Sequence, residues 1–131
     1  MRLKLGRPDI ARYRDRFDTP AAGSGAPVTL TWLGVSTLLV ADGTTAVLTD
    51  GFFSRPGLID VGLRRLAPSQ TRIEESLTRA GIDRLAAVIP VHTHFDHALD
   101  SAVVAQRTGA SMIGGTSTAN IARGQQLPDQ R

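Results

Sequence analysis

Hydrophobic and polar residues alternate in three short runs in the first half of the chain. Residues 28–33, 36–41 and 44–49 each have the period-two spacing that is typical of a strand. The last two runs are separated by Asp42-Gly43, a dipeptide that strongly indicates a two-residue hairpin turn. The pattern therefore predicts an antiparallel meander of three strands.

A longer loop at residues 51–68 is followed by a helical pattern at residues 72–80. Thr71 and Glu74 have the spacing of a capping box, in which each side chain binds the other residue's backbone N–H. Gly81 is a residue that commonly ends a helix, because it adopts the left-handed conformation without strain. We therefore expect one amphipathic helix with Thr71 as its N-cap.

The remaining chain alternates strand and helix signals. Residues 85–91 form a continuous apolar run, which predicts a strand that is buried on both faces. Helical spacing over residues 98–108, in a helix beginning near His97, is followed by a short strand at 111–114 and a turn of helix at 116–121. This order indicates the α/β class, in which functional residues gather at the carboxyl ends of the strands.

Composition limits the chain to one domain of an ordinary globular type. It has 131 residues, of which 41% are hydrophobic, and no apolar run that approaches the length of a membrane span. The first residues lack the apolar core of a signal peptide, so we expect a cytoplasmic protein. The absence of cysteine excludes disulfides and thiolate metal sites.

The net charge of +3 comes from the N-terminal segment. Residues 1–18 hold six basic and three acidic groups, whereas the other charges of the chain balance. Residues 19–27 are rich in proline, glycine and alanine, so residues 1–27 are interpreted as a basic arm with a linker before a folded unit at 28–131. A solvated arm is favoured over one that contacts a membrane surface, and no motif indicates nucleic-acid binding.

All three histidines of the chain lie in the run HTHFDH at residues 92–97, beside Asp96. Imidazole nitrogen and carboxylate oxygen suit borderline divalent ions such as zinc, iron or manganese. In an extended loop, residues i and i+2 point the same way, so His92 and His94 are predicted to bind one ion. Asp96 and His97 would reach a second position.

A simpler interpretation of the same run requires no metal. Histidines beside an aspartate can cap a helix and hydrogen-bond to one another. We favour the metal site, because the chain places no histidine anywhere else.

The HxHxDH run resembles the metal-binding signature of the metallo-β-lactamase superfamily. Flanking segments are similar to its ascorbate-6-phosphate lactonase-like branch, and to phospholipases that act on N-acylated phosphatidylethanolamines. These segments are TWLGVSTLLV at 31–40, TDGFFSRP at 49–56, AAVIPVHTHFDHALD at 86–100 and GGTSTANIARG at 114–124. The resemblance runs from about residue 28 to the end of the chain and implies an αββα sandwich.

The resemblance also implies roles for particular residues. His92 and His94 would bind one metal and Asp96 and His97 a second, with zinc expected and manganese or iron as alternatives. Asp96 would be the catalytic residue that orients the attacking water. Asp50, at the end of the third predicted strand, would lie under the metal ligands and organise them by hydrogen bonding.

The implied activity is hydrolysis by a metal-activated water. An ester, lactone or phosphodiester would be cleaved in a small-molecule substrate, phosphorylated or not. One position departs from the pattern, because relatives often have histidine where this chain has Val35.

Relatives supply three further metal ligands, a histidine, an aspartate and a last histidine, beyond this motif. No histidine follows His97 here. We therefore expect the chain to correspond to the N-terminal half of such a hydrolase and to hold less than one tightly bound ion. The alternative is a non-catalytic half-domain, or one that completes its site by self-association as a homo-oligomer.

Overall fold

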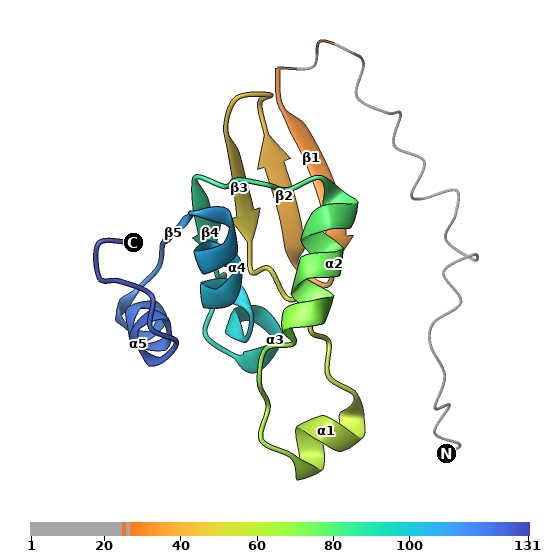
Figure 1. The fold of residues 1–131 in the computed structure, drawn as a ribbon, viewed down its shortest axis with the longest axis vertical. Helices are drawn as coiled ribbons and strands as arrows, with labels where there is room; N and C mark the ends of the chain where they lie inside the picture. The colour runs from red at the N-terminus through yellow and green to blue at the C-terminus, as the bar shows by residue number, and fades with distance from the viewer. Residues whose placement is uncertain (1–24, 26) are drawn as a thin grey trace, which may run out of the picture.

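The computed structural model describes residue 25 and residues 27–131, and Figure 1 shows their arrangement. The predicted basic arm at residues 1–18 and almost all of the predicted linker lie outside the described residues. The strands are β1 Thr29–Gly34, β2 Thr37–Ala41, β3 Ala46–Thr49, β4 Ala87–Ile89 and β5 Ser111–Met112. The helices are α1 Leu58–Leu63, α2 Gln70–Ala80, α3 Phe95–Ala98, α4 Ser101–Thr108 and α5 Thr116–Gly124.

The five strands form one mixed sheet in the order β1-β2-β3-β4-β5. The first three strands pair antiparallel through short turns, whereas β3, β4 and β5 pair in parallel. Parallel neighbours need a crossover connection, which α2 provides before β4 and α4 provides before β5. The predicted α/β class and the predicted meander are confirmed.

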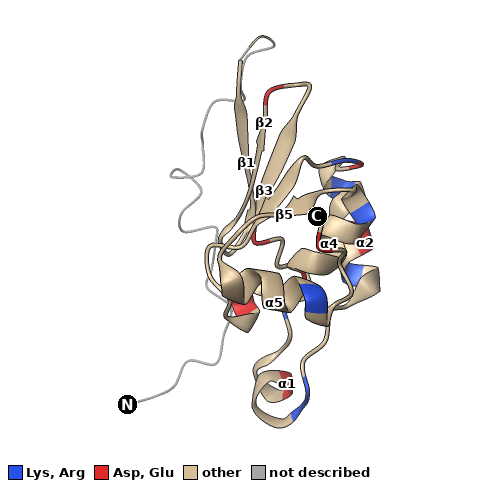
Figure 2. Cartoon of the chain, turned by 90° about the vertical axis from the view of Figure 1, so that its left-hand side faces the viewer, with Lys and Arg blue, Asp and Glu red and all other residues tan. Residues whose placement is uncertain are grey.

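The helices α2 and α4 lie on the same face of the sheet (Figure 2). The core forms between these helices and the strands, and Leu48, Ile73, Val88 and Val104 are fully buried in it. Burial of such side chains is the main source of stability in a small domain. The strands themselves contain no charged residue.

The opposite face of the sheet also carries apolar side chains. Leu30 pairs with Val40 and Trp32 with Leu38 across β1 and β2. Leu30 is 65% exposed and Trp32 is 53% exposed. This face therefore combines apolar composition with access to solvent.

The predicted capping box does not form. Helix α2 begins at Gln70 with Ser69 as N-cap, so Thr71 lies inside the helix, and no side chain caps the helix. The backbone N–H of Ser69 donates to the Ser54 hydroxyl at 2.6 Å, a tertiary contact that fixes where the helix starts. The predicted end is confirmed, because Gly81 is the left-handed C-cap.

Other predicted elements also have different limits in the structure. The turn after β2 has four residues, since Ala41 pairs with Ala46 and the Asp42 carboxylate binds the N–H groups of Thr44 and Thr45. Strand β4 has three residues instead of seven. The helix predicted at 98–108 is divided into α3 and α4 around Asp100, whose side chain is buried and bonded to another loop.

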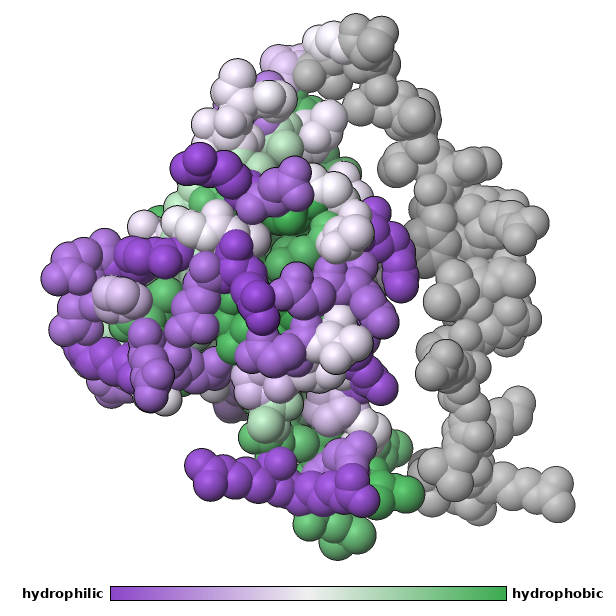
Figure 3. Space-filling model, viewed as in Figure 1, coloured by the Kyte–Doolittle hydropathy of each residue, from purple (hydrophilic) through white to green (hydrophobic). Residues whose placement is uncertain are grey.

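The predicted loop at residues 51–68 contains the short helix α1. None of its residues is buried, and Leu58, Ile59 and Leu63 are 72–83% exposed. This protrusion carries hydrophobic side chains at its end in Figure 3. No helix in the described part of the chain has the length and apolar character needed to cross a membrane.

We expect Leu48→Ala to lower the free energy of unfolding by about 2–5 kcal/mol, because it leaves a cavity in the core. Leu63→Ala is the matched control, since the same side chain is 83% exposed there. Its effect should stay within about 0.5 kcal/mol. Urea denaturation followed by circular dichroism measures both, and equal effects would contradict the described core.

Candidate metal centre

Two parallel strands bring the predicted site residues to one edge of the sheet. Thr49 at the end of β3 pairs with Ile89 at the end of β4. The next residue after β3 is Asp50, whose N–H donates to the Ile89 carbonyl at 3.2 Å. Its carboxylate accepts the N–H of Val91 at 2.8 Å. The start of the histidine run is thereby fixed beside Asp50.

His92, Asp96 and His97 come together at this edge, with one ligand atom from each within 4.8 Å of the others. His97 Nε2 lies 3.8 Å from the nearer Asp96 oxygen. Two atoms that bind one tetrahedral zinc ion lie about 3.4 Å apart, because each bond is about 2.1 Å long. The ligand atoms would therefore approach one another by up to roughly 1.4 Å, through side-chain rotation, for all three to bind one ion.

His94 is not a member of this group. Its exposed ring packs edge-on against His92, with ring centroids 4.6 Å apart. Helix α3 begins immediately after His94, and the helical turn brings Asp96 and His97 back toward His92. His92 is therefore grouped with Asp96 and His97 in the structure, and not with His94 as predicted for an extended loop.

The interpretation without a metal predicted helix capping and hydrogen bonds between the histidines. His94 is the N-cap residue of α3, but its side chain makes no capping bond. The rings of His92 and His97 are stacked at a tilt, with centroids 3.9 Å apart. Within the described part of the chain, ring contacts but no hydrogen bonds join the three imidazoles.

Asp50 is fully buried and is the partner of one metal-ligand candidate. Its second carboxylate oxygen lies 2.8 Å from His97 Nδ1. Asp50 has a positive φ of 52°, a conformation that aspartate tolerates better than most residues, and Gly51 follows with φ 77°. These two residues turn the chain away from the sheet while the Asp50 carboxylate stays beneath the histidines.

Ser36, which lies in the turn between β1 and β2, is a residue of this region that no sequence pattern predicted. Its hydroxyl bonds to the Asp50 carboxylate and lies 3.0 Å from His97 Nδ1. The preceding residue, Val35, has φ 53°, which is an unusual conformation for a β-branched side chain. The only local signal was the turn itself, because Ser36 is 61 positions from His97.

The residues after the histidine run anchor it to the core. Ser101, at the start of α4, donates its hydroxyl to the carbonyl of Asp50. The fully buried Asp100 accepts the N–H groups of Phe53 and Ser54 and the Ser54 hydroxyl. Burial raises the pKa of the Asp100 carboxyl above its ordinary value of 3.8, although the bonds from Ser54 and Phe53 act in the opposite direction.

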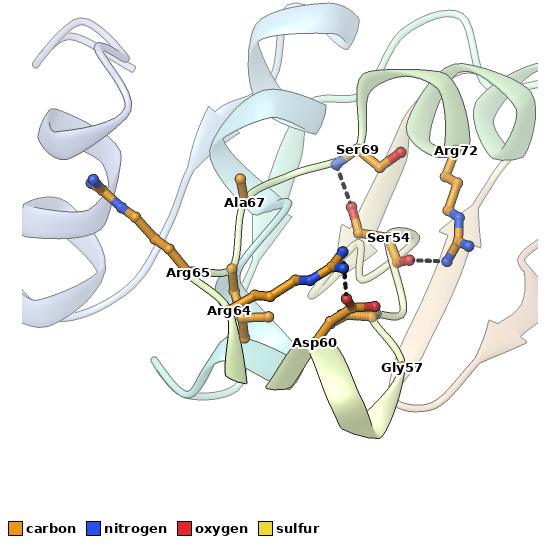
Figure 4. A pocket seen from close by; sticks show the side chains of 10 residues that line it. Ser54, Gly57, Asp60, Arg64, Arg65, Ala67, Ser69 and Arg72 are labelled. Atoms are coloured by element: carbon orange, nitrogen blue, oxygen red, sulfur yellow. Dashed lines mark hydrogen bonds and ion pairs between the residues drawn. The ribbon is translucent and has the colours of Figure 1, made fainter. Parts of the chain in front are cut away.

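A separate cavity of about 350 Å³ lies beside α1 and the start of α2 (Figure 4). Arg64 in this cavity is paired with Asp60 at 3.2 Å. Arg72 donates to the carbonyls of Ser54 and Arg55, and the Arg65 side chain points away from the others in Figure 4. The cavity contains none of the histidines, and its Asp60, Arg64 and Arg72 side chains already have partners within the chain.

His92, Asp96 and His97 together form the histidine cluster, and their donor atoms fit a borderline divalent ion. Two imidazoles and one carboxylate are the ligands that catalytic zinc sites commonly use. Asp50 occupies Nδ1 of His97, which leaves Nε2 facing Asp96. His92 is exposed and Asp96 is 45% exposed at its side chain, so the cluster is open to solvent on one side.

No family model matches this chain. No curated protein matches it either.

Asp100→Asn should remove one contribution to the pH dependence of stability. A carboxyl whose pKa is higher in the folded than in the unfolded protein binds a proton more readily when folded. Its contribution to the free energy of unfolding is therefore greatest below the unfolded pKa of 3.8 and is lost as pH rises through the folded pKa.

The measurement compares urea denaturation of the two proteins at several pH values. The free energy of unfolding of the wild type relative to Asp100→Asn should fall as pH rises from the unfolded pKa of 3.8 through the higher folded pKa of Asp100. Asp129→Asn is the control, since Asp129 is exposed and paired with Arg123 at 2.8 Å. A relative stability that rises with pH would contradict the assignment.

Proposed function

We propose that this chain carries the metal site of a metal-dependent hydrolase of the metallo-β-lactamase type. The observation that supports this most directly is the convergence of His92, Asp96 and His97 above the buried Asp50. Such a carboxylate–histidine pair is the usual arrangement behind a metal-binding imidazole. The proposed substrates are esters, lactones or phosphodiesters of small molecules.

The fold supports the proposal in a second way. An αββα sandwich packs a second sheet against the free face of the first. The face of β1 and β2 that carries Leu30, Trp32, Leu38 and Val40 is apolar and uncharged, which suits such packing. The helices α2 and α4 would then be the outer layer on this side.

Each residue of the cluster has a defined task in the proposal. His92 and His97 donate ring nitrogens to the ion, and Asp96 donates an oxygen. His94, whose ring packs on His92, is proposed as an additional ligand after rotation of its side chain. Asp50 holds His97 in place through Nδ1 and excludes water from beneath the ring by its own burial.

A bound divalent cation would supply water acidified toward neutral pH and would polarise the bond to be cleaved. Asp96 would orient the attacking water and accept its proton, because its carboxylate is the solvent-accessible acid of the cluster. The open side of the cluster, where His92 and His94 are exposed, is the side from which a substrate would approach.

We expect the purified chain, freed of metal by a chelator, to bind no more than one zinc ion per molecule. His92→Ala, Asp96→Ala and His97→Ala should each abolish measurable binding, whereas His94→Ala should weaken it less. Asp50→Asn should weaken binding about 10–100-fold, the usual cost of losing a partner behind a ligand. Isothermal titration with zinc measures these affinities, and cobalt absorption reports the ligand geometry.

Asp129→Ala is the matched control for Asp96→Ala, because it removes an exposed aspartate that is remote in sequence. Circular dichroism must show that each variant is folded. Two stoichiometric ions, or equal binding by wild type and His92→Ala, would refute the proposed site.

The activity is tested separately with p-nitrophenyl acetate, a thiobutyrolactone and bis-p-nitrophenyl phosphate. Metal-dependent turnover that Asp96→Ala removes would support the hydrolase. Metal binding without turnover of any of the three would favour the non-catalytic alternative, in which the cluster binds a metal and does no chemistry.

A further inference from the structure

Three polar groups meet beneath the histidine cluster. The Ser36 hydroxyl bonds to Oδ2 of Asp50, and the same oxygen lies 2.8 Å from His97 Nδ1. The Ser36 hydroxyl oxygen is also 3.0 Å from that nitrogen. Each group therefore contacts the other two.

The number of donor hydrogens on Ser36, Asp50 and His97 determines which hydrogen bonds these three groups can form. Asp50 as a carboxylate only accepts, and its Oδ1 is already used by the N–H of Val91. The Ser36 hydroxyl has one proton, which it donates to Oδ2. A bare Nδ1 on His97 would then face two oxygen acceptors with no proton between them. A proton on Nδ1 satisfies both contacts and leaves Nε2 with a free lone pair.

The chain holds Ser36 firmly in this position. Its carbonyl accepts the Thr49 hydroxyl at 2.6 Å, and Thr49 in turn accepts the N–H of Leu38 at 2.8 Å. The turn is also fixed by the indole N–H of Trp32, which donates to the Val35 carbonyl at 2.9 Å. The backbone of Ser36 is therefore attached to both β2 and β3, which places its side chain beside Asp50 and His97.

We propose that Ser36 is a positioning residue that acts through Asp50 to fix the tautomer and orientation of His97. Ser36 gives Asp50 its second hydrogen bond on Oδ2 and offers a second acceptor to Nδ1–H. Asp50 is thereby kept facing the ring, and the ring is kept with its bare Nε2 toward Asp96 and His92. The use of Nε2 for a metal rests on the proposed function, whereas the tautomer is a property of the metal-free protein.

The tautomer is measured by two-dimensional proton–nitrogen NMR of the metal-free protein labelled with ¹⁵N-histidine. The spectrum is recorded well above the pH at which free imidazole is protonated. Because the chain has three histidines, His92→Gln/His94→Gln leaves His97 as the one imidazole and assigns its signals. In this background His97 should carry its proton on Nδ1.

Ser36→Ala in the same background should raise the population of the Nε2–H form at least severalfold, since free imidazole of histidine prefers that form. Ser36→Thr should restore the Nδ1–H form, because it retains the hydroxyl. Ser69→Ala is the control, as the Ser69 side chain caps nothing in α2. A purely structural role for Ser36 would lower stability without changing the tautomer.

Two results would overturn the proposal. One is a proton on Nε2 of His97 in the protein with Ser36 intact, a result that does not depend on any Ser36 variant folding. The other is an unchanged tautomer in a folded Ser36→Ala variant. Zinc titration separates this proposal from the function, because zinc binding with an unchanged tautomer refutes the role of Ser36 alone. The expected tautomer shift without zinc binding supports the role of Ser36 and refutes the metal site.

Discussion

The buried carboxylate of Asp50 joins the parts of the molecule on which the candidate site depends. One of its oxygens accepts the N–H of Val91 and so fixes the chain that leaves β4. The other contacts His97 and Ser36, which come from α3 and from the turn between β1 and β2. Asp50 is fully buried, so these bonds form away from competing water, where a missing partner would cost the most.

The polar groups beneath the site form a connected set. Ser101 binds the carbonyl of Asp50, and the neighbouring Asp100 binds the backbone of Phe53 and Ser54. Among the described residues, no buried side-chain nitrogen or oxygen lacks a hydrogen-bond partner. A buried network that is fully satisfied restricts the chain to one arrangement, which keeps the side chains of the candidate site in fixed positions.

The sheet provides the rigid support for this network. Strands β3 and β4 pair in parallel, so their carboxyl ends lie side by side, and the residues that follow them become neighbours. Helix α4 then packs its buried face, with Val103 and Val104, against the core that contains Leu48 and Val88. The exposed histidines therefore lie on a loop that is fixed at one end by hydrogen bonds to Asp50 and at the other by the apolar packing of α4.

The sequence by itself determined the α/β class, the meander, the C-terminal end of α2 and the group of residues from which the candidate site is built. These follow from local patterns, such as the alternation in β1 to β3, Gly81 after a helical run and the three histidines in six positions. The predicted start of α2 was wrong, because the tertiary bond between Ser54 and Ser69 fixes where that helix begins. The division between α3 and α4 was not predicted, because it depends on the tertiary bonds of Asp100. The grouping of His92 with Asp96 and His97, and the contact of Ser36 with His97 across 61 positions, were decided by the tertiary structure alone. No periodicity in a sequence records which residues of distant segments will share one buried carboxylate.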